Sequence, residues 1–339
     1  MATWLNACTD NSPENDDNRC EALKICRTIS ASLSLIGCLL ALVVILVYKK
    51  FKFLTQRLVM YLLLPCTFMA LFSLHNISGN TSVCSAKGFF RNFFALSQNF
   101  WIICINVHLL TVLIMRSKYR HLEKIYHSVV WGGAFLVSLI PLFGNHYGNA
   151  GIWCWIQGHT KYENVLRVIC YYMWLLIMIF GGALIYIFII FKVLQRVNSY
   201  EGTYSPENEQ SKQQYKKSIR PLLFYPIINV LLASVPIANR IHNWSHPGHP
   251  NFGLSLAHSI TSPLFGFVNA CLFLLNKDTL IQLHPVNFWN ALCIWSKSTF
   301  TFARSSAEPK AKNLDYTMKD QMPTLSKISG NDETVADME

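Results

Sequence analysis

Seven long apolar stretches, separated by shorter polar segments, dominate the pattern of the chain. A helix that spans the hydrocarbon core of a bilayer needs about 20 consecutive apolar residues. The stretches contain no Asp, Glu, Lys or Arg, and they cover residues 28–48, 58–77, 92–115, 128–143, 168–191, 221–239 and 253–275. The pattern therefore predicts an all-α membrane protein with a bundle of seven transmembrane helices.

The composition also favours a membrane protein. Hydrophobic residues make up 52% of the 339 residues and charged residues only 14%, with a mean hydropathy of +0.28. A soluble domain is typically about a quarter charged. The net charge of +11 would suit a nucleic-acid-binding protein, but the bases are grouped by loop, which membrane topology explains. We expect no nucleic-acid partner.

The Lys and Arg residues are distributed unevenly between the connecting loops. The loops after the first, third and fifth stretches hold fourteen of them, and the loops after the second, fourth and sixth hold five. Because cytoplasmic loops are enriched in Lys and Arg, we expect an extracellular N-terminus and a cytoplasmic C-terminus. The predicted domains are an extracellular segment (1–27), a seven-helix core (28–276) and a cytoplasmic tail (277–339).

Two further features bear on this orientation. Three Asn-x-Ser/Thr glycosylation patterns, at Asn76, Asn80 and Asn243, fall on the side predicted to be extracellular. The first residues lack the basic and apolar regions of a cleaved signal peptide. We therefore expect glycosylation at these asparagines and an uncleaved first span.

Cys154 stands between Trp153 and Trp155 in the predicted second extracellular loop. Thiols pair in an oxidising compartment, and we predict a disulfide with Cys84, just before the third stretch. The bridge would hold both indoles at the membrane interface, where the ring is apolar and the N–H is wet. The alternative is a free thiol beside incidental tryptophans. Three further cysteines have no assigned pairing: Cys8, Cys20 and Cys26.

No enzyme is expected. The most metal-like pattern is HNWSHPGH, in which His242, His246 and His249 lie in the predicted third extracellular loop. Pro247 interrupts the spacing and no Cys or carboxylate is nearby, so no helix face collects the imidazoles. We interpret the segment as an ordinary polar loop and expect neither a metal nor a cofactor.

The apolar stretches carry amide, hydroxyl and imidazole groups although they lack charges. In hydrocarbon these groups are expected to turn inward and form interhelical hydrogen bonds, worth about 1 kcal/mol each. They include Gln98, Asn99, Asn106, Asn229, Asn239, His258 and Asn269. Pro226 and Pro236 give the sixth helix a place to bend. We expect ligand binding to bias this helix toward a conformation that opens a cytoplasmic cleft.

Three short motifs carry a resemblance to a receptor family: WCWI at 153–156, LLFYPIINVLLASVPIANRI at 222–241 and FVNACLFLLN at 267–276. Together with seven spans, they resemble the cyclic-AMP-receptor-like, or class E, family of G-protein-coupled receptors. The resemblance implies a plasma-membrane receptor that binds an extracellular ligand and activates a heterotrimeric G protein. The alternatives are a secretin- or adhesion-like receptor, which shares the Cys-Trp pair, and a small-solute transporter, for which internal repeats are missing.

The outer loops carry an excess of bases, with Lys87, Arg91, Lys161, Arg167 and Arg240 against Glu163 alone. Arginines at the ends of three spans would converge on the bundle mouth and bind a phosphate or carboxylate. The alternative is that they anchor the helices at the interface or pair with acidic N-terminal residues. The candidate ligand contacts are Arg91, Gln98, Trp153, Trp155, Arg167, Asn239, Arg240 and His258.

The residues expected to face the G protein are basic: Arg116, Lys212, Lys216, Lys217 and Arg220. The last four are spaced so that several share one helical face that extends the sixth membrane helix. The same bases would also set orientation or bind anionic lipid, so G-protein coupling rests on the family resemblance.

The C-terminal tail divides into two parts. Residues 277–295 mix polar and large apolar residues, which predicts an amphipathic segment on the inner membrane surface, broken at Pro285, with Cys293 available for palmitoylation. From Ser296 the chain is polar, and we expect a disordered tail. Phosphorylation of this tail would suit an arrestin partner. The candidate phosphorylation sites are Ser298, Thr299, Ser305 and Ser306.

Overall fold

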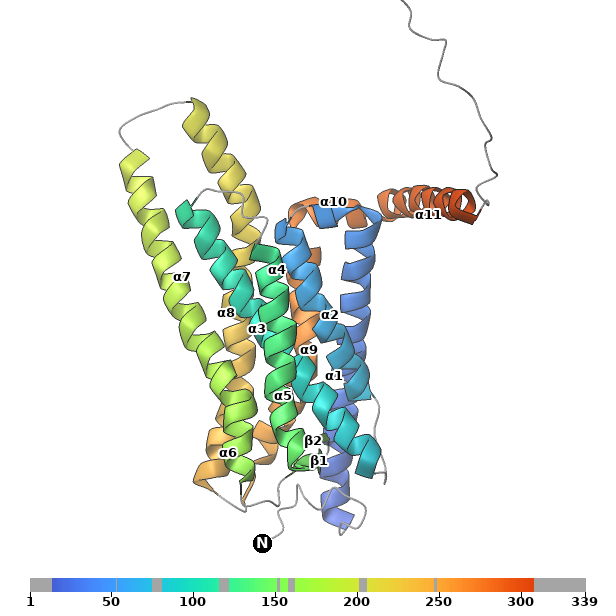
Figure 1. The fold of residues 1–339 in the computed structure, drawn as a ribbon, viewed down its shortest axis with the longest axis vertical. Helices are drawn as coiled ribbons and strands as arrows, with labels where there is room; N and C mark the ends of the chain where they lie inside the picture. The colour runs from blue at the N-terminus through green and yellow to red at the C-terminus, as the bar shows by residue number, and fades with distance from the viewer. Residues whose placement is uncertain are drawn as a thin grey trace, which may run out of the picture. The chain divides into compact units, whose positions relative to one another are not determined.

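Seven helices long and apolar enough to cross a membrane run through the described part of the chain (Figure 1). The computed structural model describes residues 14–52, 54–74, 81–115, 122–150, 153–157, 162–200, 206–246 and 249–307. The predicted seven-helix architecture is confirmed. Asn76, Asn80 and Arg116 lie outside the described residues, as do Cys8 and Lys161.

The seven spans are formed by α1 (Glu14–Val47), α2 (Leu54–Leu74), α3 (Thr81–Met115), α4 with α5 (Leu122–His127, Gly133–Phe143), α6 with α7 (Glu163–Arg167, Met173–Tyr200), α8 (Pro206–Ser245) and α9 (Phe252–Leu274). The fourth and fifth spans each contain a π-helical turn, η2 (Ser128–Gly132) and η3 (Val168–Tyr172). The remaining elements are η1 (Lys50–Lys52), the strands β1 (Tyr147–Asn149) and β2 (Cys154–Ile156), and the helices α10 (Lys277–Leu283) and α11 (Pro285–Ala307).

Several helices begin before the charge-free stretches do. The third begins at Thr81 rather than near residue 92, and the fifth begins at Glu163 rather than near residue 168. A long basic side chain does not end a helix at the membrane boundary, because its charged group can reach a polar environment while its stem packs. Arg91 and Arg167 therefore lie within helices and not in loops.

Helix α3 is the central helix of the bundle. It packs against α2, α5, α7 and α8, and against both strands, while α1 packs against α2 and α9. The hairpin of β1 and β2 lies at one end of the bundle and α10 lies at the other (Figure 1). We call these the hairpin end and the α10 end.

The bundle buries amide groups among an apolar core and exposes large apolar side chains on its outer surface. On α7, Leu184 and Ile187 are 69% and 63% exposed, whereas Asn92, Asn229 and Asn269 are fully buried. Large apolar side chains exposed over a whole helix face require a lipid environment. The expectation that amide groups within the spans turn inward is confirmed for Asn229 and Asn269, and Asn92 behaves in the same way.

The first, second and seventh spans are packed tightly together at Gly266 of α9. A Cβ atom at this position would lie 2.9 Å from Cys38 Sγ of α1 and 3.0 Å from Cys66 Cβ of α2. No side chain fits there, so glycine is required for the three helices to meet.

The tail is helical further along than expected. Helix α10 ends at Leu283 and α11 begins with Pro285, so the predicted break is confirmed. Helix α11 continues to Ala307, and the expectation of disorder from Ser296 is wrong for residues 296–307. No Pro or Gly interrupts 286–307, which leaves the helix free to continue. Residues up to Leu292 belong to one compact unit and those from Cys293 to a second.

An ion pair joins the second span to the fourth at the α10 end. Arg57 Nη2 and Nε each lie 2.7 Å from a carboxylate oxygen of Glu123, and Tyr61 Oη donates to Glu123 Oε1 at 2.8 Å. Arg57 Nη1 also donates to the carbonyl oxygen of Phe51 at 3.1 Å, which closes the loop between α1 and α2. A bidentate pair of this kind fixes geometry better than a single contact does.

We expect Glu123→Gln to lower the stability of the bundle by about 1 kcal/mol, the upper value for partly exposed pairs. The neighbouring Lys124→Gln is the control, because Lys124 is exposed and makes no ion pair among the described residues. Thermal unfolding in detergent micelles measures the difference. Equal melting temperatures for the two variants would contradict a structural role for the pair.

Candidate functional site

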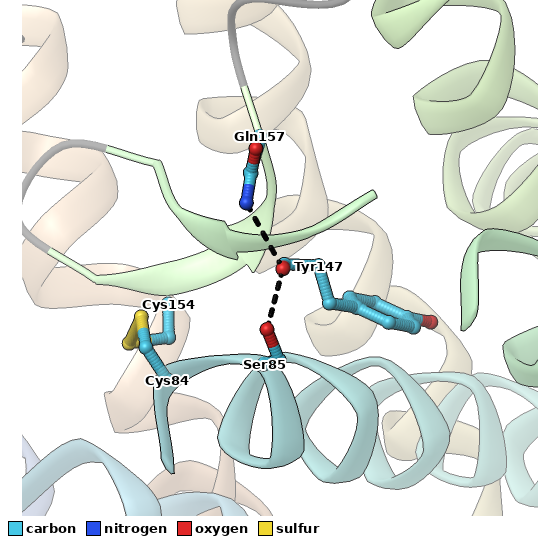
Figure 2. The surroundings of a disulfide bond; sticks show 5 residues. All are labelled: Cys84, Ser85, Tyr147, Cys154 and Gln157. Atoms are coloured by element: carbon cyan, nitrogen blue, oxygen red, sulfur yellow. Dashed lines mark hydrogen bonds between the residues drawn. A yellow bond between two sulfur atoms is a disulfide. The ribbon is translucent and has the colours of Figure 1, made fainter. Parts of the chain in front are cut away.

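A short antiparallel hairpin is tied to the third helix at the hairpin end (Figure 2). Strand β1 pairs with β2, with Asn149 opposite Cys154. Cys154 is bonded to Cys84 of α3, with the Cα atoms 5.3 Å apart. The predicted disulfide is therefore confirmed. Ser85 Oγ and Gln157 Nε2 both donate to the carbonyl oxygen of Tyr147, at 2.7 and 3.1 Å.

Tyr147 inserts the hairpin into the bundle. Its ring is 1% exposed, and its hydroxyl donates to the carbonyl oxygen of Ser138 at 2.9 Å. Burial raises the pKa of the Tyr147 phenol, so the group remains a donor. A Cβ atom at Gly88 of α3 would lie 3.0 Å from the Tyr147 ring and 3.4 Å from the Trp155 backbone. Glycine at this position lets the hairpin rest directly on α3.

Trp155 points into the bundle. It is 8% exposed, and its Nε1 donates to Asn92 Oδ1 of α3 at 3.0 Å. Asn92 Nδ2 in turn donates to Ser138 Oγ at 3.2 Å. The expectation that both indoles sit at the membrane interface with a wet N–H is wrong for Trp155, because a buried amide acceptor on α3 draws the ring inward.

The fifth span contacts the hairpin from the side. Arg167 is buried, and its Nη2 donates to the carbonyl oxygen of Ile156 at 2.9 Å. Its guanidinium lies 5.7 Å from the Trp155 ring and its Nη1 lies 3.3 Å from Glu163 Oε1. The charge of Arg167 is therefore balanced within its own helical turn.

The π-helical turn η3 places two tyrosines beneath the hairpin. Tyr171 and Tyr172 meet the Trp155 ring edge-on, with centroids 5.6 and 6.0 Å from it. Tyr172 Oη accepts a hydrogen bond of 2.9 Å from Arg240 Nε of α8, whose guanidinium lies 5.5 Å from the tyrosine ring. A π turn redirects the side chains of a helix, and here it joins the hairpin to the sixth span.

Trp153, on the other side of Cys154, is half-buried against two guanidinium groups. Arg27 of α1 lies 5.6 Å from its ring and Arg91 of α3 lies 5.3 Å from it. His258 of α9 lies 5.4 Å from the same ring. Cation–π contacts of this kind contribute up to about 2 kcal/mol when desolvated. One indole thus collects side chains from the first, third and seventh spans.

His258 joins this group to the sixth span. Its Nδ1 lies 3.0 Å from Asn239 Nδ2, and both residues are buried. Arg27 and Arg91 meet His258 at the Trp153 ring, and Arg240 directly follows Asn239 in α8. We call the set Arg27, Arg91, Trp153, Arg240 and His258 the guanidinium cluster.

The guanidinium cluster is suited to an anion. Arg91 and Arg240 form no ion pair within the part of the chain that the structure describes. Arg27 and Arg91 lie 5.6 and 5.3 Å from the same indole ring, so their positive charges repel one another. A phosphate or carboxylate placed among these groups would relieve the repulsion and accept charge-assisted hydrogen bonds.

Seven of the eight predicted ligand contacts lie at the hairpin end. Arg91, Trp153, Arg240 and His258 belong to the guanidinium cluster, and Trp155, Arg167 and Asn239 lie beside it. Gln98 is the exception, because its Oε1 accepts from Cys66 Sγ at 3.3 Å, two turns of α3 away from Arg91. Sequence reasoning missed four residues: Arg27, Asn92, Tyr171 and Tyr172. Arg27 had a signal, since it directly precedes the first apolar stretch as Arg91 precedes the third.

The histidine-rich segment differs from its prediction. Helix α8 extends to Ser245, so His242 lies in a helix, and its ring stacks on that of His246 with centroids 4.8 Å apart. Asn243 also lies in this helix rather than in a loop. No group of three potential metal ligands occurs among the described residues.

Other predicted functional residues lie away from the guanidinium cluster. Lys212, Lys216, Lys217 and Arg220 lie in the first half of α8, which extends beyond the membrane span as expected. Cys293 is a free, half-buried thiol. Cys20 is disulfide-bonded and Cys26 is free, which excludes a pair between them. The G-protein contacts of the α8 bases and the palmitoylation of Cys293 stay predictions.

Comparison with known proteins gives a family match over most of the chain. Residues 15–321 match the model of the slime mold cyclic AMP receptor family. Cyclic AMP receptor-like protein A of Dictyostelium discoideum is 26% identical over 262 residues, which is 77% of this chain and 65% of that protein. G-protein coupled receptor 1 of Arabidopsis thaliana is 26% identical over 265 residues, 76% of this chain and 79% of that protein.

A third relative covers less of the chain. Latrophilin receptor-like protein A of Dictyostelium discoideum is 23% identical over 131 residues, 38% of this chain and 43% of that protein. The chain spans about two thirds of the length of the first relative and less than half of the third. All three are named as receptors.

We expect Asn92→Ala to destabilise the protein by about 1–3 kcal/mol, because it leaves the buried Trp155 N–H without an acceptor. The exposed Trp244→Phe is a control for loss of an indole donor at the same end. The melting temperature in detergent micelles, measured without a ligand, gives the comparison. An Asn92→Ala protein as stable as the wild type would show that the hairpin does not depend on this bond.

Proposed function

Because the chain belongs to the slime mold cyclic AMP receptor family, we propose that it is a plasma-membrane G-protein-coupled receptor whose ligand binds at the hairpin end. The relatives that cover most of the chain are named as a cyclic AMP receptor-like protein and a G-protein coupled receptor. These names support a receptor and give no support to an enzyme. Activation of a heterotrimeric G protein at the α10 end is part of the proposal.

The guanidinium cluster is the observation that carries the ligand part of this proposal. It gathers side chains from the first, third and seventh spans around Trp153 of the hairpin, and Asn239 of the sixth span is bonded to His258. Arg91 and Arg240 have no carboxylate partner among the described residues. A small anionic ligand placed among these side chains would bridge the first, third, sixth and seventh spans. Cyclic AMP, named in the family description, is the first compound to test.

The orientation is part of the proposal and follows from charge. The connections at the α10 end carry most of the loop Lys and Arg residues, which favours the cytoplasm. The disulfide at the opposite end favours an oxidising compartment. An antibody tag at residue 1 should be detected on intact cells; detection only after permeabilisation would contradict this orientation.

The route from ligand to G protein runs through the sixth helix. Asn239 and Arg240 of α8 contact His258 and Tyr172 at the hairpin end. A ligand that binds Arg240 more tightly in one arrangement of α8 than in another shifts the population of the two arrangements. Helix α8 continues past the membrane span to Pro206, so a tilt near Pro236 or Pro226 moves its basic end.

The alternative classes have less support. A secretin- or adhesion-like receptor shares the Cys-Trp pair of the second loop, but the cyclic AMP receptor family model matches 15–321. A small-solute transporter would need ionisable groups along the inside of the spans. In this chain Arg27, Arg91, Arg167 and Arg240 lie at the hairpin end of their spans, and Arg57 is paired with Glu123 at the α10 end.

We expect Arg91→Gln and Arg240→Gln each to weaken the potency of an anionic agonist at least tenfold, a loss of about 1.4 kcal/mol. Arg91→Lys keeps the charge but loses the planar fork, so it should weaken potency less than Arg91→Gln. Lys87→Gln, one helical turn away, is the matched control for loss of a positive charge. Agonist-dependent nucleotide exchange on a G protein, in membranes with equal surface expression, is the measurement.

Two results would contradict the proposal. If no G protein responds to any compound in a panel that begins with cyclic AMP, the receptor activity is unsupported. If an agonist is found and both glutamine variants respond as Lys87→Gln does, the arginines anchor the helices and do not bind the ligand.

A further inference from the structure

Two buried amides form a reciprocal pair between the sixth and seventh spans. Asn229 Nδ2 of α8 donates to Asn269 Oδ1 of α9, and Asn269 Nδ2 donates to Asn229 Oδ1, both at 3.1 Å. Each nitrogen also donates to a carbonyl oxygen of its own helix, that of Tyr225 at 2.7 Å and that of Phe265 at 2.8 Å. We call this pair the asparagine clasp.

Every amide hydrogen and both amide oxygens of the asparagine clasp have a hydrogen-bond partner, unlike several other amides of the bundle. Both residues are fully buried, and all four amide hydrogens have acceptors. By contrast, Asn99, Asn106 and Asn239 each keep one buried amide atom without a partner among the described residues. A fully paired polar contact in a membrane interior specifies one arrangement of two helices, because any shift leaves groups unpaired in hydrocarbon.

The position of the clasp links it to the guanidinium cluster. The same two helices are joined at the hairpin end by Asn239 and His258, ten and eleven residues from the clasp. At 1.5 Å per residue the two bridges are about 15 Å apart along the helices. Pro236 lies between them on α8 and removes one backbone donor there. A bendable segment is therefore held at both of its ends.

When the clasp opens, each amide nitrogen keeps one of its two hydrogen bonds. When α8 and α9 separate, the two bonds across the gap are lost, while the bonds to Tyr225 and Phe265 stay within their own helices. Two states then differ by two hydrogen bonds, which is the scale on which a ligand shifts an equilibrium. This is the property expected of a reversible contact rather than of a permanent one.

We propose that the asparagine clasp is a latch that holds the sixth helix against the seventh in the resting state, and that the active state breaks it. The inference rests on the proposed function, because it assigns the clasp to the same movement of α8. It predicts that loss of the clasp favours the active arrangement without a ligand.

The test compares single and double leucine variants. Asn229→Leu and Asn269→Leu each leave one buried amide without its partner, so both should melt below the wild type. The double variant removes both amides and should recover most of the melting temperature. Thr261→Val is the control, because among the described residues Thr261 Oγ1 bonds only to carbonyl oxygens of its own helix.

Two readouts separate the latch from receptor activity. The first is the distance between spin labels at Phe224 of α8 and Ile125 of α4, which are 48% and 53% exposed at the α10 end. The second is nucleotide exchange on a G protein without a ligand. The labelled protein carries serine in place of the half-buried free cysteines, Cys26, Cys271 and Cys293.

In the double variant we expect a longer label distance and basal exchange raised by about thirtyfold, the factor that corresponds to two membrane-buried hydrogen bonds of about 1 kcal/mol each. A longer distance without any exchange would support the latch and contradict the proposed G-protein coupling. Unchanged distances in the double variant, matching Thr261→Val, would overturn the latch, whether or not the single variants fold.

Discussion

A covalent bridge between Cys84 and Cys154 fixes the hairpin to the end of the central helix, and the arrangement of the site depends on it. The bridge joins residues 70 positions apart in the chain, and Tyr147 holds the other strand through the Ser138 carbonyl. Because Cys154 is fixed, the tryptophans on either side of it make contacts with different parts of the bundle. Trp155 is bonded to Asn92 inside the bundle, and Trp153 lies against two guanidinium groups.

The bilayer supplies the second constraint. In lipid, a polar group on a helix must find a partner within the protein, so amides such as Asn92, Asn229 and Asn269 are buried and paired. Arg91 and Arg240 obey the same rule at the hairpin end, where Arg91 lies over the Trp153 ring and Arg240 contacts the ring and hydroxyl of Tyr172. A positive group satisfied by an indole can exchange that contact for an anion, which a guanidinium paired with a carboxylate does less readily.

The sequence predicts the bundle well because a span needs only apolar length, a property of each segment alone. The Cys84–Cys154 bridge was also predictable, from the compartment that the loop charges indicate. The paired strands were not predicted, since three-residue strands are set by the disulfide and by the seat on Gly88 rather than by their own pattern. The inward position of Trp155 was not predicted either, because its acceptor Asn92 lies 63 residues away in the chain. Arg27 was missed because the search for charge-free stretches placed it just outside the first span.

The central claim is that the side chains around Trp153 form the ligand site of a receptor. A cryo-electron microscopy structure of the protein with a bound agonist, in a complex with a G protein, tests it most directly. We expect ligand density between Arg91, Arg240 and His258, with an acidic group of the ligand facing the guanidinium groups. Density that lies elsewhere, with Arg91 still stacked on Trp153 and Arg240 still bonded to Tyr172, would contradict it.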